Sequence, residues 1–227
     1  MIKLHFLYNA VADLIYPNAC ELCNKVISHS TAPICYGCIA SLPKSNFSSM
    51  EFNPIKDKLY DIANLKTCIS IFKYQKDNKT QKLIHMLKYR SKKKIGLFFA
   101  GELAKIIENQ KLSFDYVIAV PMHKSKEKLR GFNQTKIITN SLSKKIAIPE
   151  LDIIDKYVDT TSQTKKSIYQ RWTNQEEKFK LKQLDIICGK HILIIDDVIT
   201  TGATMHSCLK LFENMDVTIS IASIAYS

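Results

Sequence analysis

Apolar residues follow two different periods along the chain from about residue 65 onward. Four short runs rich in β-branched and aliphatic residues are typical of buried strands: residues 67–74, 115–120, 191–195 and 216–225. Between them, apolar residues three and four positions apart predict helices over residues 80–90, 97–109, 134–146 and 205–214. Strands that alternate with helices favour an α/β fold, a mostly parallel twisted sheet flanked by helices. We expect one such domain over residues 65–227.

The residues before this domain have a different pattern. Residues 1–16 carry an apolar stripe at helical spacing that polar residues interrupt, which predicts an amphipathic helix rather than a signal peptide. Residues 41–64 contain prolines, serines and asparagines with weak periodicity, so we expect a module over residues 1–45 and a linker over residues 46–64. No apolar run has the length of a membrane span. These patterns predict a cytoplasmic protein; a helix peripheral to the inner membrane is the alternative for residues 1–16.

Four of the seven cysteines form two Cys-x2-Cys pairs with eleven residues between the pairs: Cys20, Cys23, Cys35 and Cys38. This spacing is typical of a tetrahedral four-thiolate zinc site. Four sulfur ligands leave no open coordination position, so the zinc would be structural. A zinc-ribbon-like module this short cannot build its own core and would draw its folding free energy from the metal. Disulfides, which suit a secreted protein, and free thiols are the alternatives.

Candidate chemistry concentrates where the apolar run at residues 191–195 ends. Two carboxylates follow, the candidate catalytic residues Asp196 and Asp197, which offer oxygen ligands to sugar hydroxyls or to a hydrated magnesium ion. A short loop then leads into the predicted helix: Thr200, Thr201, Gly202, Ala203 and Thr204. Its backbone N–H groups, its hydroxyls and the helix start favour a phosphate, and Gly202 allows close approach. This order predicts a ribose 5-phosphate site; a turn and a capped helix without a ligand are the alternative.

Charge points to the class of partner. The chain carries 30 lysines and three arginines, with a formal net charge of +12. Such an excess of basic over acidic residues favours polyanionic partners such as nucleic acid or phosphorylated ligands. An excess of lysine can also come from an AT-rich genome. Nine of the basic residues, among them Lys88 and Arg90, lie within residues 73–94 together with Tyr74 and Tyr89. Cations on phosphates and tyrosines stacked on bases predict a contact with single-stranded DNA; a solvated helix face fits equally well.

The acidic pair and the threonine loop resemble the phosphoribosyl-pyrophosphate motif of type I phosphoribosyltransferases. In that family, the turn after the preceding strand holds pyrophosphate and a mobile loop then closes over the ligand. The resemblance implies ligand contacts for the residues of that turn: Pro121, Met122 and His123. It also implies pyrophosphate or DNA contacts for cationic residues: Lys124, Lys126, Arg130 and Arg171. Lys88 and Arg90 of the basic stretch are further candidates for a pyrophosphate or DNA contact. Gly131 would be a hinge of the loop, and a merely solvated His123 is the alternative for that residue.

Further motifs narrow the resemblance to one branch. The chain is similar to the ComF family of competence proteins in its four-cysteine module, in Arg-Gly-Phe-Asn-Gln at residues 130–134, and in later polar and aromatic positions: Gln163, Arg171, Asn174 and Phe179. The resemblance covers nearly the whole chain. The chain differs from the family directly before Arg130. The family usually has further arginines there, whereas this chain has lysines and Leu129. Lysine keeps the charge but loses the bidentate fork of arginine.

The resemblance to the ComF family implies a competence protein for DNA uptake in natural transformation. It would bind single-stranded DNA and 5-phosphoribosyl pyrophosphate with Mg2+, contain a structural Zn2+, and have membrane-associated DNA-uptake proteins as partners. The alternative is a nucleobase-salvage phosphoribosyltransferase that releases pyrophosphate, although the sequence offers no residues that read a base. A third alternative is a zinc-dependent structural protein with a vestigial phosphoribosyl site. For the competence protein, the resemblance is compatible both with a site that transfers phosphoribose and with a site that only binds it.

Overall fold

A computed structural model of the chain describes residues 18–27, 32–45, 53–62, 64–89, 92–157, 178–182 and 184–227. At its centre is a five-stranded sheet with the strand order β1-β7-β6-β2-β3, in which each neighbouring pair is parallel. The strands are β1 (Leu65–Lys73), β7 (Val217–Tyr226), β6 (Lys190–Ile199), β2 (Tyr116–Ala119) and β3 (Glu150–Leu151). The expected mostly parallel α/β fold is therefore confirmed.

Strand β6 contributes to a separate hydrophobic core on each face of the sheet. Ile192 and Ile194 pack into one cluster, whereas Leu193 and Ile195 pack into the other. All four side chains are 0% exposed, because neighbouring side chains of a strand point to opposite faces and both faces are covered. This double burial explains the continuous apolar run in the sequence.

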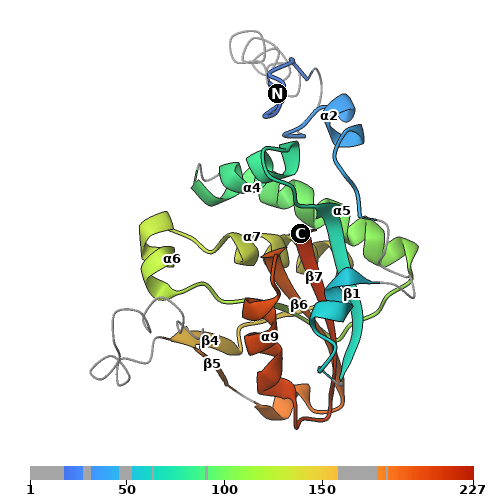
Figure 1. The fold of residues 1–227 in the computed structure, drawn as a ribbon, viewed down its shortest axis with the longest axis vertical. Helices are drawn as coiled ribbons and strands as arrows, with labels where there is room; N and C mark the ends of the chain where they lie inside the picture. The colour runs from blue at the N-terminus through green and yellow to red at the C-terminus, as the bar shows by residue number, and fades with distance from the viewer. Residues whose placement is uncertain are drawn as a thin grey trace, which may run out of the picture.

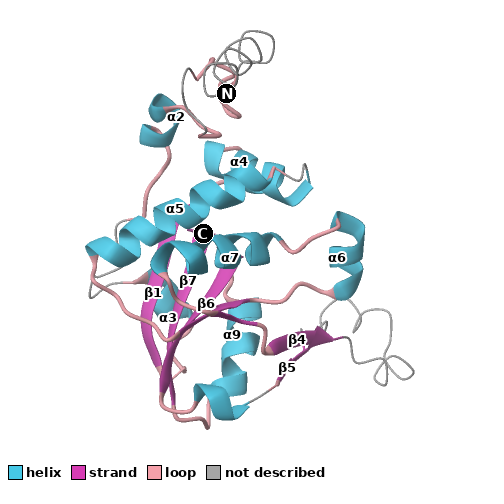
Figure 2. Ribbon diagram, turned by 180° about the vertical axis from the view of Figure 1, so that it is seen from behind, coloured by secondary structure: helices cyan, strands magenta, loops and turns pink. Residues whose placement is uncertain are grey.

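Three helices cover the face of Leu193 and Ile195. They are α4 (Lys79–Tyr89), α5 (Lys93–Asn109) and α7 (Gln134–Ile146). Leu83 of α4, Phe99 of α5 and Ile138 of α7 are fully buried in the same cluster. Figures 1 and 2 show these helices grouped together in both views. Their bounds agree with the predicted helices to within one residue, except that α5 begins four residues earlier than expected.

Shorter segments cover the opposite face. They include the helices α3 (Pro54–Lys58) and α9 (Ala203–Leu209), the 3-10 turns η2 (Leu184–Ile187) and η3 (Lys210–Phe212), and a two-stranded antiparallel ribbon, β4 (Ile154–Tyr157) with β5 (Lys178–Leu181). Each of these segments buries apolar side chains in the cluster that holds Ile192 and Ile194. Within the described residues, no helix combines the length and apolar character that crossing a membrane requires.

Helix α3 lies in the stretch that we expected to be a linker. The side chain of Asn53 accepts hydrogen bonds from the backbone N–H groups of Ile55 and Lys56 at 3.1 and 3.3 Å, and Pro54 occupies the first turn. An asparagine cap followed by proline is a known helix start. Ile55 and Leu59 are then buried in the core. Residues 53–62 therefore pack as part of the α/β fold.

A second difference lies between β2 and α7, where the resemblance implied a loop. Residues there form the helix α6 (Lys124–Arg130), which ends at Gly131 in a left-handed conformation with φ of +78°. A left-handed glycine is a common helix terminator, so Gly131 acts as a cap in this structure. The predicted helix over residues 1–16 lies outside the described residues, as do Arg90, Arg171 and residues 160–177.

Two glycines of α5 give opposite expectations for substitution by alanine. A Cβ on Gly96 would lie 2.7 Å from Ile137 Cγ2 of α7, whereas a Cβ on Gly101 would meet nothing within 4 Å. Gly96→Ala should lower the free energy of unfolding by about 1–3 kcal/mol through overpacking. Gly101→Ala should raise it by about 0.5–1 kcal/mol, because alanine is the better helix former. Urea unfolding of both variants checks the pair; equal stability of the two would contradict this account of the α5–α7 contact.

Candidate functional site

Strand β6 reaches beyond the neighbouring strand β2. β2 pairs with β6 as far as Ala119 and Ile195, while β6 continues beside β7 to Ile199. Both acidic residues therefore lie inside the strand, which corrects the expectation that the strand ends before Asp196. They stand where β2 has already ended, at the carboxyl edge of the sheet, which is where open α/β sheets bind ligands.

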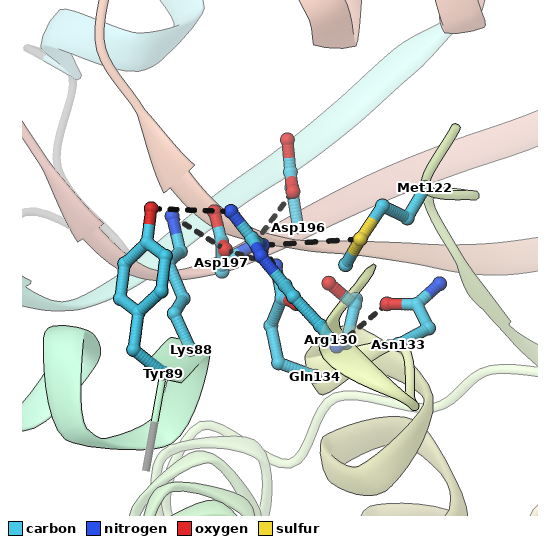
Figure 3. A network of polar contacts seen from close by, with 9 residues as sticks. Lys88, Tyr89, Met122, Arg130, Asn133, Gln134, Asp196 and Asp197 are labelled. Atoms are coloured by element: carbon cyan, nitrogen blue, oxygen red, sulfur yellow. Dashed lines mark hydrogen bonds and ion pairs between the residues drawn. The ribbon is translucent and has the colours of Figure 1, made fainter. Parts of the chain in front are cut away.

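The two carboxylates face different surroundings. Asp196 helps to line an open hollow together with the threonine loop. Asp197 lies on the side of α4 and α7, and Figure 3 shows it among side chains from which Asp196 points away. Neighbouring side chains of a strand point to opposite faces, so this separation follows from the continuation of β6. The backbone N–H of Asp197 donates to Asp196 Oδ1 at 2.7 Å and links the two residues.

The predicted phosphate loop forms the wall of the hollow. All five of its residues line it: Thr200, Thr201, Gly202, Ala203 and Thr204. Gly202 has a φ of +85°, a conformation that other residues rarely adopt, and its missing Cβ would lie 3.5 Å from Lys58 Cβ. Thr201 Oγ1 accepts a hydrogen bond from the backbone N–H of Ala203 at 3.4 Å. The structure thus brings the loop and one of the two carboxylates together around a single concave surface.

Asp197 is the centre of a buried polar network. Only 7% of the residue is exposed. Lys88 Nζ of α4 lies 2.8 Å from its Oδ2, and Gln134 Nε2 of α7 donates to the same oxygen at 2.6 Å (Figure 3). A buried carboxylate needs such compensation, since an unpaired charge away from water is costly. The sequence predicted Lys88 as a pyrophosphate or DNA contact, and it did not single out Gln134 for a contact with Asp197.

Arg130 extends this network toward the surface. Its Nη1 donates to Gln134 Oε1 at 3.2 Å, and its Nη2 lies 3.4 Å from the Tyr89 hydroxyl. Its guanidinium is 5.0 Å from the centre of the Tyr89 ring, within cation–π range. The His85 ring is 4.6 Å from the same tyrosine ring. Arg130 therefore orients Gln134 and stacks on an aromatic side chain that is 60% exposed.

The Arg-Gly-Phe-Asn-Gln motif acquires a local explanation from these contacts. Gly131 ends α6, and the side chain of Asn133 caps α7 by accepting from the backbone N–H of Thr135 at 2.9 Å. Arg130 and Gln134 support Asp197. The motif thus joins two helix ends to the acidic pair.

The turn after β2 contains three further predicted ligand residues: Pro121, Met122 and His123. Met122 Sδ lies 3.8 Å from Arg130 Nη1. His123 Nδ1 accepts from the backbone N–H of Ser125 at 3.2 Å and lies 2.6 Å from its hydroxyl, so this imidazole caps α6. Lys124 is exposed at the start of that helix. The side chain of Lys126 lies outside the described part of the chain.

The four predicted zinc ligands are close together. All their sulfur atoms lie within 4.8 Å of one another, and those of Cys23 and Cys35 are 3.6 Å apart. Sulfurs bound to one tetrahedral zinc would be about 3.8 Å apart, whereas a disulfide requires about 2.05 Å. The cluster therefore fits a zinc ion better than disulfides.

Hydrogen bonding and burial give two thiols of this cluster opposite shifts in pKa. The pKa of Cys20 is lowered to about 6: burial alone would raise it, but backbone N–H groups of neighbouring residues donate to the sulfur and outweigh it. Cys35 N–H is one of these donors, at 3.3 Å. The pKa of Cys38 is raised to about 12 by burial and by the adjacent sulfurs. Thiolates are the zinc-binding form, and a cation in the cluster would favour them.

The cysteine cluster packs against the α/β domain. Besides the cysteines, residues 18–45 contain the short helix α2 (Tyr36–Ala40), which Figure 1 shows beyond α4. Ile34 and Leu42 are buried in the same hydrophobic cluster as α4. Lys92 Nζ and Glu21 Oε1 form an ion pair at 2.9 Å across this contact. Lys79 Nζ of α4 donates to Ser41 Oγ at 2.6 Å, so the module also contacts the helix that carries Lys88.

Sequence comparison identifies the family of this fold and site. A family model described as the phosphoribosyl transferase domain matches residues 92–227. The chain therefore belongs to the phosphoribosyl transferase domain family.

Curated relatives agree with the resemblance to competence proteins. Competence protein F of Haemophilus influenzae is 28% identical over 207 residues, which cover 87% of this chain and 85% of that protein. Competence protein ComFC of Streptococcus pneumoniae is 30% identical over 122 residues, 54% of this chain and 50% of that protein. DNA utilization protein YhgH of Escherichia coli K12 is 27% identical over 135 residues, 57% of this chain and 59% of that protein. The resemblance to the ComF family is thus confirmed.

The solved structures that match this chain include adenine phosphoribosyltransferases. The protein from Leishmania tarentolae matches with a TM-score of 0.44 and 8% identity, covering 72% of this chain and 92% of that one. The protein from Trypanosoma brucei matches with a TM-score of 0.43 and 11% identity, covering 72% and 83%.

Proposed function

We propose that this protein acts in the uptake of transforming DNA and binds both single-stranded DNA and 5-phosphoribosyl pyrophosphate with Mg2+. The observation that carries the proposal is the shared hollow of Asp196 and the threonine loop, in a chain similar to competence and DNA utilization proteins. The proposal includes a cytoplasmic location and membrane-associated DNA-uptake proteins as partners.

The residues around the hollow suit the two ends of a phosphorylated sugar. Backbone N–H groups and the hydroxyls of Thr200, Thr201 and Thr204 would hold the 5-phosphate. The carboxylate of Asp196 would accept hydrogen bonds from the ribose hydroxyls or share a bound Mg2+. Asp197, held by Lys88 and Gln134, would fix the strand that carries Asp196. Mg2+ bound with the ligand would supply charge that stabilises a departing pyrophosphate.

The outer surface of helix α4 suits a single strand of nucleic acid. Helix α4 exposes Lys79, Lys82 and His85 on its outer side and ends at the exposed ring of Tyr89. Cations neutralise backbone phosphates, and an exposed aromatic ring can stack on an unpaired base. Tyr89 also contacts Arg130, which supports the acidic pair through Gln134. The proposed DNA surface is therefore linked to Asp197, and not directly to the hollow, through Arg130 and Gln134.

Calorimetric titration with 5-phosphoribosyl pyrophosphate and Mg2+ tests the first ligand. The wild type should bind, and Asp196→Asn should weaken binding about tenfold or more through loss of charge-assisted contacts. Asp185→Asn, an exposed carboxylate outside the hollow, is the matched control and should bind as the wild type does. Unchanged binding by Asp196→Asn would mean that the site is elsewhere. Release of pyrophosphate with a free nucleobase would favour nucleobase salvage instead.

Fluorescence anisotropy with a labelled single-stranded oligonucleotide tests the second ligand. Between 50 and 200 mM salt, affinity should fall roughly 20- to 100-fold if three to five phosphates are neutralised. Lys79→Gln combined with Lys82→Gln should weaken binding, whereas Lys144→Gln with Lys145→Gln, exposed near the end of α7, should not. Absence of binding at the lower salt concentration would refute the DNA part of the proposal.

A further inference from the structure

A lysine that the sequence patterns did not single out lies beside the threonine loop. Lys58, at the end of α3, donates through its Nζ to the backbone oxygens of Thr200 and Ser227. The backbone N–H of Ser227 in turn donates to the carbonyl oxygen of Ile199 at 3.0 Å. A single ammonium group therefore bridges the ends of β6 and β7, at the residue where the loop begins.

This contact determines the direction of a peptide group in the loop. The described chain has no cis peptide bonds, and in a trans peptide the C=O and N–H groups point in opposite directions. While Lys58 holds the Thr200 carbonyl, the N–H of Thr201 must point away from Lys58. Thr200 and Thr201 line the hollow and Lys58 does not, so the ammonium acts from outside the binding surface. The Thr201 N–H is thereby left for a ligand.

The residues that follow Lys58 hold the other end of the loop. Asp61 Oδ2 lies 2.8 Å from His206 Nε2 of α9, and Lys210 Nζ lies 3.4 Å from the same oxygen. The backbone N–H of His206 donates to the Gly202 carbonyl at 2.8 Å. The pKa of Asp61 is lowered, mainly because His206 donates to it. Leu59 is buried in the same cluster as Met205 and anchors this segment beneath the loop.

The geometry points to Lys58 as a positioning residue for the 5-phosphate group, which orients the N–H groups of the loop and adds positive charge beside the anion. Residues 58–62 would thus complete the phosphate site from a segment that the family match, residues 92–227, does not include. This inference rests on the proposed function, because it takes the threonine loop to be the phosphate cradle. Pyrophosphate, which would bind at the turn after β2, should not depend on Lys58.

Separate titrations with ribose 5-phosphate and with inorganic pyrophosphate test the inference. Lys58→Met should raise the Kd for ribose 5-phosphate about tenfold or more, as expected for loss of a charge-assisted contact, and leave the Kd for pyrophosphate unchanged. Lys58→Arg keeps the charge and the donors and should retain most of the affinity. Lys56→Met removes an exposed lysine from the same helix and is the matched control. A purely structural defect would weaken both ligands together.

The possible outcomes separate this inference from the proposed function. Failure of the wild type to bind ribose 5-phosphate overturns both. Binding by the wild type with equal binding by Lys58→Met overturns the role of Lys58 alone, as does an equal loss for ribose 5-phosphate and pyrophosphate. Should Lys58→Met fail to fold, Asp61→Asn provides a second variant that releases His206. It should weaken ribose 5-phosphate binding a fewfold, and unchanged affinity would count against the positioning role of residues 58–62.

Discussion

Cys38→Ser is expected to remove bound zinc and to unfold the cysteine module. The other three sulfurs cannot complete a tetrahedral thiolate site, and structural zinc contributes an apparent binding free energy of about 10–16 kcal/mol in small modules. Among the described residues of the module, the buried hydrophobic side chains other than cysteines are Ile34 and Leu42, which form too small a core to fold alone. Its folding should therefore depend on the metal. In the variant, the backbone amide hydrogens of residues 32–45 should therefore exchange with solvent faster than in the wild type.

Metal analysis by mass spectrometry and hydrogen exchange measure this outcome. Cys188→Ser is the control, because Cys188 is exposed and lies outside the four-sulfur cluster. It should keep the zinc content of the wild type. A wild-type protein that contains no zinc, and gains no thermal stability when zinc is added, would refute the metal site.

Lys88→Met is expected to lower the free energy of unfolding by about 3 kcal/mol, because it leaves the buried Asp197 carboxylate without its cation. The Lys88 side chain is 23% exposed and that of Asp197 10%, so water relieves part of the penalty and the loss should lie at the low end for buried pairs. The Gln134 hydrogen bond remains but carries no charge. Adding Asp197→Asn should restore part of the lost stability, since it removes the uncompensated charge.

Urea unfolding of the wild type, both single variants and the double variant gives the coupling energy of the pair. Lys82→Met is the matched control: it removes an exposed lysine from the same helix and should change stability by less than about 0.5 kcal/mol. Equal effects of Lys88→Met and Lys82→Met would show that the ion pair contributes nothing to folding.

Elements with strong local signals could be predicted from the sequence. Helix α7 was expected over residues 134–146 and spans Gln134–Ile146, because Asn133 caps its start and an apolar stripe covers its length. Helix α3 was not predicted, because five residues are too few to show a helical period of apolar positions. The Asn53-Pro54 cap was its only local signal. The helix expected over residues 205–214 is divided into α9 and the 3-10 turn η3, which share one buried apolar face. Periodicity alone does not distinguish a helix from a helix followed by a tighter turn.

Parts of the site depend on contacts that no local pattern contains. The sequence indicated the acids and the threonine loop, yet β6 was expected to end at the first polar residue. Pairing of Ile199 with Tyr226 keeps the strand in the sheet beyond that point. Gln134 reaches Asp197 across 63 positions of sequence, and Lys58 reaches Thr200 across 142. Such partners are set by the packing of whole elements, which the residue pattern of a single element does not determine.

Strand β1 lies outside the sequence that the family model matches, although it belongs to the same sheet. The recognisable family sequence begins at residue 92, but β1 precedes it and pairs with β7 from Leu65 to Lys73. A fragment beginning at residue 92 would leave β7, almost entirely buried in the intact fold, as an open sheet edge. Bare apolar edges recruit strands from other molecules, which leads to aggregation. Residues 92–227 are therefore the part of the chain that the family shares in sequence. A fragment that folds without aggregating should also include β1.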